Sequence, residues 1–91
     1  MSVMDVIELY ERASTVYGEE AQRRVAIEEL SELIKELCKY DRGEANEDAI
    51  CEEMADVSIC LEQLLVMFQC ETRVDYWRAF KLNRLKNRLS E

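Results

Sequence analysis

The chain has 91 residues, of which 48% are hydrophobic, and its 20 acidic and 12 basic residues give a net charge of −8. This length accommodates one domain with a small core, and so acidic a chain lacks the dominant basic surface of a nucleic-acid-binding protein. No segment offers the roughly 18 apolar residues of a membrane helix, and the acidic N-terminal segment is unlike a signal peptide. We therefore expect a cytoplasmic protein with neither a nucleic-acid nor a membrane partner.

Helix-breaking residues are sparse throughout the chain, and the first half predicts two helices. Proline is absent, and the only glycines are Gly18 and Gly43, which is typical of a nearly all-helical chain. A first helix is expected from about Val3 to Val16, ending at Gly18. A second is expected from about Glu19 to Tyr40, followed by a turn over residues 41–45.

The second half predicts two more helices. The third is expected to be capped by Asn46 and to continue to about Gln69, becoming apolar nearly all round, which indicates burial on every side and a subunit interface. The fourth, from about Arg73 to Leu89, should direct apolar side chains towards a core. These side chains are Val74, Trp77, Leu82, Leu85 and Leu89. The prediction is a single all-α domain over residues 1–91, a bundle of about four helices completed as a homodimer or homotetramer.

The cysteine and histidine content restricts the possible chemistry. There are four cysteines without a CxxC motif, and there is no histidine. Zinc sites and Ser-His or Cys-His catalysis are therefore not expected, and the cysteines are predicted to be small buried apolar side chains in a reducing compartment. Any catalysis must rely on carboxylates, lysine, arginine and a metal ion.

One acidic pattern occurs twice. The segment 28–32, Glu-Glu-Leu-Ser-Glu, is repeated at 52–56 as Glu-Glu-Met-Ala-Asp. On a helix, each set of three carboxylates falls within an arc of roughly 100°, next to the apolar stripe. Such patches on two helices could hold Mg²⁺, which prefers oxygen ligands and keeps positions for phosphate and water. A solvated acidic face is the alternative, and the pattern by itself does not decide between them.

The order and spacing of these motifs resemble the all-α nucleoside triphosphate pyrophosphohydrolases, the MazG-like and dimeric dUTPase-like superfamily, over about residues 17 to 88. The resemblance implies that Glu29, Glu32, Glu53 and Asp56 bind Mg²⁺, with Mn²⁺ as a possible substitute. It implies that Glu28 helps to hold a further ion or orients the attacking water. A carboxylate among Glu28, Glu29 and Glu32 could accept the proton of that water, and Glu28 and Glu29 are the predicted catalytic residues. Glu52 and Glu36 are interpreted as peripheral.

The family reaction cleaves a nucleoside triphosphate between its α and β phosphates, giving the monophosphate and pyrophosphate. Lys81 and Arg84 match a basic pair of the family and would contact pyrophosphate, or they simply balance the charge of an acidic chain. Trp77 could stack on the base or belong to the core. The base and sugar are left open. The alternatives to an enzyme are a non-catalytic oligomerisation or partner-binding module and a nucleotide-binding protein without turnover.

Overall fold

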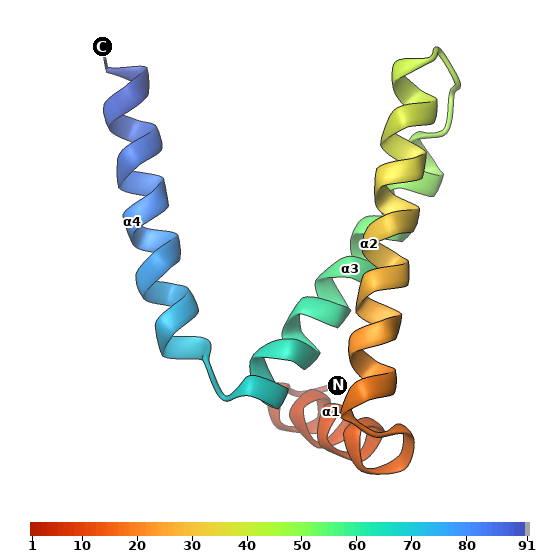
Figure 1. Cartoon of the computed structure of the whole chain (residues 1–91), viewed down its shortest axis with the longest axis vertical. Helices are drawn as coiled ribbons and strands as arrows, with labels where there is room; N and C mark the ends of the chain where they lie inside the picture. Colours follow the sequence, from red (N-terminus) through yellow and green to blue (C-terminus); the bar gives the residue numbers. More distant parts are fainter. Residues whose placement is uncertain (91) are drawn as a thin grey trace.

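The computed structural model describes residues 1–90, which form four helices and no strand (Figure 1). They are α1 (Val3–Tyr17), α2 (Glu19–Asp41), α3 (Glu47–Phe68) and α4 (Glu71–Leu89). The all-helical prediction is confirmed, and each helix begins and ends within two residues of its predicted bounds. In residues 1–90 no helix combines the length and apolar character needed to cross a membrane.

The ends of α1 are defined by local hydrogen bonds. At its start, the Ser2 hydroxyl accepts from the Asp5 amide at 3.2 Å, while the Ser2 amide donates to the Asp5 carboxylate at 3.0 Å. These two bonds form a capping box, and the backbone bond from Ser2 is the main reason why the pKa of Asp5 is lowered. At its end Gly18 adopts a φ of 85°, which favours glycine, and its amide donates to the Ser14 carbonyl.

Asn46 occupies the position before α3, but its predicted role as a side-chain cap is wrong. Its side chain makes no capping hydrogen bond to α3. Instead, the Asn46 amide nitrogen donates to the Glu36 carboxylate at 2.6 Å and to the Glu36 carbonyl at 2.9 Å. The bond from Asn46, followed by that from Lys39, lowers the pKa of Glu36. Asn46 therefore fastens the start of α3 to α2 and closes the helical hairpin.

The main packing in the chain is between α2 and α3, which run side by side, while α1 lies across one end of the pair (Figure 1). The small core comprises Tyr10, Ala26, Val57 and Cys60. Ala26 is 4% exposed and marks the buried side of α2. The Tyr10 hydroxyl donates to the Glu62 carboxylate and so attaches α1 to α3. This arrangement fixes the two helices that carry the repeated acidic motif.

Within the single chain, α4 does not complete the bundle. It diverges from the α2–α3 pair after a short link in which Gln69 has a left-handed backbone with φ 49° (Figure 1). All its described residues are exposed in the single chain, so the predicted burial of Val74, Trp77, Leu82, Leu85 and Leu89 in a core completed by a second copy stays a prediction. On α3, Leu61 is 50% exposed and Phe68 55% in the single chain, so the predicted burial of this helix on every side at a subunit interface also stays a prediction. Apolar surface on both helices thus remains without a partner in the chain.

Candidate metal site

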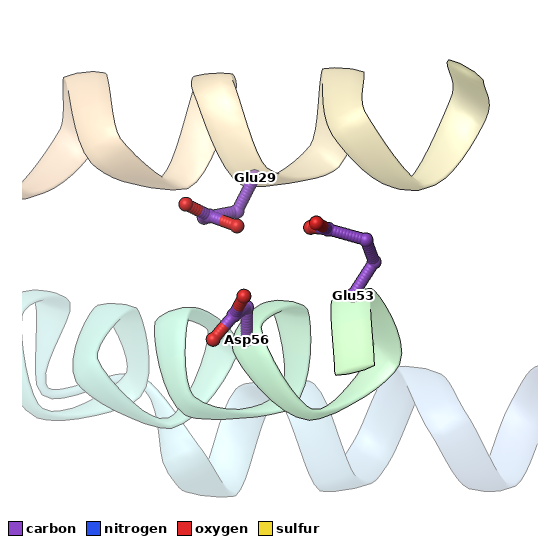
Figure 2. Close-up of side chains that lie close together, drawn as sticks. All are labelled: Glu29, Glu53 and Asp56. Carbon is purple, nitrogen blue, oxygen red and sulfur yellow. The ribbon is translucent and has the colours of Figure 1, made fainter. Parts of the chain in front are cut away.

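Three carboxylates converge between α2 and α3. Glu29 extends from α2 towards Glu53 and Asp56, which are three residues apart on one face of α3 (Figure 2). One oxygen from each residue can be chosen so that all three lie within 4.8 Å of one another. The packing of the α2–α3 pair brings together residues that are 24 positions apart in the sequence. The repeated motif thus contributes carboxylates from both of its copies to one cluster.

Without a cation, the three carboxylates of the cluster repel one another in a partly buried position. All three side chains are partly buried, and the Glu53 Oε2 atom is buried with no hydrogen-bond partner. The pKa of Glu29 is raised, first by desolvation and then by the neighbouring carboxylates of Glu53 and Asp56. Burying like charges without compensation is costly, and a proton or a cation would relieve the cost.

The donor set fits a hard divalent cation. All three residues offer carboxylate oxygens, the ligands that Mg²⁺ and Mn²⁺ prefer, and a set of three leaves coordination positions for water and phosphate. The thiol of Cys60 lies nearby, but its pKa is raised by burial and by the charges of Glu29 and Asp56, so it stays protonated. The buried, unpaired oxygen of Glu53 is the feature that a cation would satisfy most directly.

The other acidic residues of the motifs lie outside this cluster. Glu28, Glu32 and Glu52 are exposed and do not belong to the group of three. The role of Glu32 as a fourth metal ligand and that of Glu28 as a catalytic carboxylate stay predictions. Glu36 bonds to Asn46 and Lys39, and it stabilises the hairpin.

The predicted substrate-binding residues are all on α4. Lys81, Arg84 and Trp77 are exposed, and α4 makes no extensive contact with α2 or α3 in residues 1–90, so one chain does not bring them to the carboxylates. Trp77 instead packs edge-to-face against Tyr76, at 5.4 Å between ring centres, and against Phe80, at 5.9 Å. Their contact with a nucleotide stays a prediction.

Cys60 is the neighbour of the cluster that the sequence interpretation missed. It is 6% exposed and follows Asp56 by four residues, one helical turn. That i, i+4 spacing could have placed it beside the acidic site. The predicted burial of the cysteines is confirmed for Cys60 but is wrong for Cys38 and Cys51, which are exposed, while Cys70 is half-buried.

Comparisons with protein-family models, with curated proteins and with solved structures find no match.

Without divalent cations, the raised pKa of Glu29 should make the protein less stable as the pH rises. Above the ordinary value of 4.5 the folded state binds this proton more tightly than the unfolded chain, so the free energy of unfolding falls until the raised pKa is passed. Melting temperatures measured in chelator from about pH 4.5 to 8 should decline more steeply than those of Glu29→Gln. Because a cation competes with the proton, stabilisation by Mg²⁺ should grow over the same range. Equal slopes in both proteins would contradict this prediction.

Proposed function

We propose that this protein is a Mg²⁺-dependent nucleotide pyrophosphohydrolase that hydrolyses a nucleoside triphosphate to the monophosphate and pyrophosphate. The observation that carries the proposal is the convergence of Glu29, Glu53 and Asp56 between two helices, with the Glu53 Oε2 atom buried and unpaired. The order of the acidic motifs resembles that of the all-α nucleoside triphosphate pyrophosphohydrolases. This resemblance supports cleavage between the α and β phosphates as the reaction.

The charge of the site explains why a cation would be needed. A triphosphate carries roughly four negative charges, which three neighbouring carboxylates would repel. Bound Mg²⁺ would neutralise phosphate charge and lower the pKa of a coordinated water. Glu53 and Asp56 would hold the cation from α3, and Glu29 would face them from α2.

The proton of the attacking water would pass to Glu28 or Glu29. Glu29 is inside the cluster, next to the place where the cation and its water would be held, while Glu28 precedes it on the exposed side of α2. The water oxygen would form the new bond to the α phosphorus, the bond from that phosphorus to the bridging oxygen would break, and pyrophosphate would leave. Lys81 and Arg84 of a neighbouring copy would bind the leaving group.

A non-catalytic oligomerisation module is the second candidate. The unpartnered apolar surface of α4 favours it, since every described residue of that helix is exposed. In this case the carboxylates would serve only as a polar face, and the buried oxygen of Glu53 would have no function. The two candidates therefore differ in how the protein responds to divalent cations.

Pyrophosphate release tests the proposal directly. The assay should use Mg²⁺ and a panel of canonical and modified nucleoside triphosphates, with a chelator as the metal-free control. We expect release from at least one of them, equal amounts of monophosphate, and complete loss in chelator. Magnesium-dependent nucleotide binding without release would indicate a non-hydrolysing binder. No release, together with a melting temperature indifferent to Mg²⁺, would support the oligomerisation module.

A further inference from the structure

The isolated chain exposes far more surface than a compact protein of its mass. Its accessible surface is 7533 Å², against about 5,500 Å² for a compact monomer of 10.7 kDa. Its radius of gyration is 16.1 Å, against about 12 Å for a compact chain of this length. Each copy thus exposes an excess surface of roughly 2,000 Å². A stable interface of standard size buries about 1,200–2,000 Å² over both partners together, so the excess is large enough for one. The open shape is caused by α4, which stands apart from the helix pair (Figure 1).

One part of the excess is an apolar groove along α3. Met54, Val57, Leu61 and Leu65 follow one another at helical spacing, and Leu33 of α2 lines the same groove. Met54 is 56% exposed and Leu61 50%. From the first to the last of these residues, α3 advances by about 16 Å. The only charged residue of the groove is acidic, Glu62.

A stripe of the same length runs along α4. It begins at Val74, continues through Trp77 and Leu82, and ends at Leu85, again about 16 Å of helix. Trp77 is 54% exposed and Leu85 50%. The two charged residues of this stripe, Arg78 and Lys81, are basic. The groove and the stripe therefore match in length and apolar character and are opposite in charge.

The charge of the whole chain follows the same division. Helix α4 contains six basic and two acidic residues, a net charge of +4. Residues 1–70 contain six basic and 17 acidic residues, a net charge of −11. A basic helix on an acidic chain is complementary to the body of a second copy. In its own chain α4 diverges from that body beyond Gln69 (Figure 1).

We propose that α4 of one copy lies in the groove along α3 of a second copy, and that the exchange is reciprocal. A two-fold axis would then bury both stripes and both grooves in one self-complementary interface. Arg78 would lie beside Glu62 of the partner groove, and Trp77 would be the large aromatic anchor of the contact. This inference rests on surface shape and charge and does not depend on the proposed enzymatic activity.

The test combines the mass in solution with the emission of Trp77, the only tryptophan of the chain. Three full-length variants are compared with the wild type by sedimentation equilibrium and by fluorescence. Leu61→Asp alters the groove, and Leu85→Asp alters the stripe. Leu9→Asp is the matched control, because Leu9 is 51% exposed on α1, outside both surfaces. Since all three positions are about half exposed, circular dichroism should confirm that each variant keeps its helices.

The wild type and Leu9→Asp should have twice the chain mass of 10.7 kDa, and Trp77 emission should shift to longer wavelength on dilution. Leu61→Asp and Leu85→Asp should each raise the dissociation constant by more than ~10-fold, because a carboxylate would be desolvated in the interface. The decisive result is Leu61→Asp, whose substitution on α3 should expose Trp77 on α4. A dimer unaffected by Leu61→Asp would overturn the proposal in favour of pairing between two α4 helices. A monomer at every concentration would overturn it in favour of α4 folding onto its own chain.

Discussion

Replacing Glu53 with glutamine should remove most of the stabilisation of the protein by magnesium. In chelator, Glu53→Gln should melt at a higher temperature than the wild type, because it removes one of three converging carboxylates and the one with a buried, unpaired oxygen. In Mg²⁺ the order should invert, since the wild type gains stability from the bound cation and the variant gains little. Pyrophosphate release should fall by at least ~100-fold, the scale for removing a group that stabilises transition-state charge.

Glu52→Gln is the matched control for this experiment. Glu52 precedes Glu53 on α3, is exposed and lies outside the carboxylate cluster, so the same chemical change there removes one charge but no metal ligand. Its melting temperature should rise with Mg²⁺ as in the wild type, and release should be within a few-fold of normal. Equal behaviour of the two variants would contradict the assignment of Glu53 to a cation site.

Truncating Tyr10 should have the largest effect on stability. Tyr10 is 7% exposed and is the only buried residue of α1, so Tyr10→Ala should lower the free energy of unfolding by about 3 kcal/mol, as for other buried aromatic side chains. This is a large part of the total of about 5–15 kcal/mol for a small domain. Urea denaturation at fixed protein concentration measures the change. A loss below about 1 kcal/mol would show that α1 is not anchored through this ring.

Tyr10→Phe separates the ring from its hydroxyl. This variant keeps the buried ring and removes only the hydrogen bond to Glu62. It should therefore lower the free energy of unfolding by about 1 kcal/mol near neutral pH. Burial, followed by the bond to Glu62, raises the pKa of Tyr10 from 10.0 to about 12. The wild type should therefore lose stability as the pH rises from about 10 to 12, where only the unfolded chain readily gives up this proton. Tyr10→Phe has no phenolic proton to lose, so it should not show this loss of stability between about pH 10 and 12.

The helices were predictable from the sequence because their ends depend on local chemistry. Gly18 and Gly43 both have positive φ, and each lies where one predicted helix stops. The position of α4 was not predictable in the same way. An apolar stripe at helical spacing requires a partner surface, but the spacing does not specify which surface or which copy of the chain provides it. The apolar residues on the exposed side of α3 likewise do not specify the surface that covers them.

The carboxylate cluster was predictable in part, for a reason that lies in the rotation of α2 about its axis. Ala26 is buried, so it marks the side of α2 that faces α3. Counting around the helix, Glu29 lies about 60° from Ala26 and Glu32 about 120°. Glu29 therefore reaches Glu53 and Asp56, while Glu32 turns towards solvent. The motif identified the two helices that carry the cluster, and the rotation of α2 about its axis selects which of its carboxylates meet those of α3.

The separation of charge between α4 and the rest of the chain makes each molecule a strong electric dipole with a net charge of −8. At very low ionic strength two copies repel each other over the whole molecule, which is 44 Å long. At physiological ionic strength the screening length is about 8 Å, so the general repulsion is removed while a basic helix still attracts an acidic surface at close range. Moderate salt should therefore speed the encounter of two copies, and high salt should slow it.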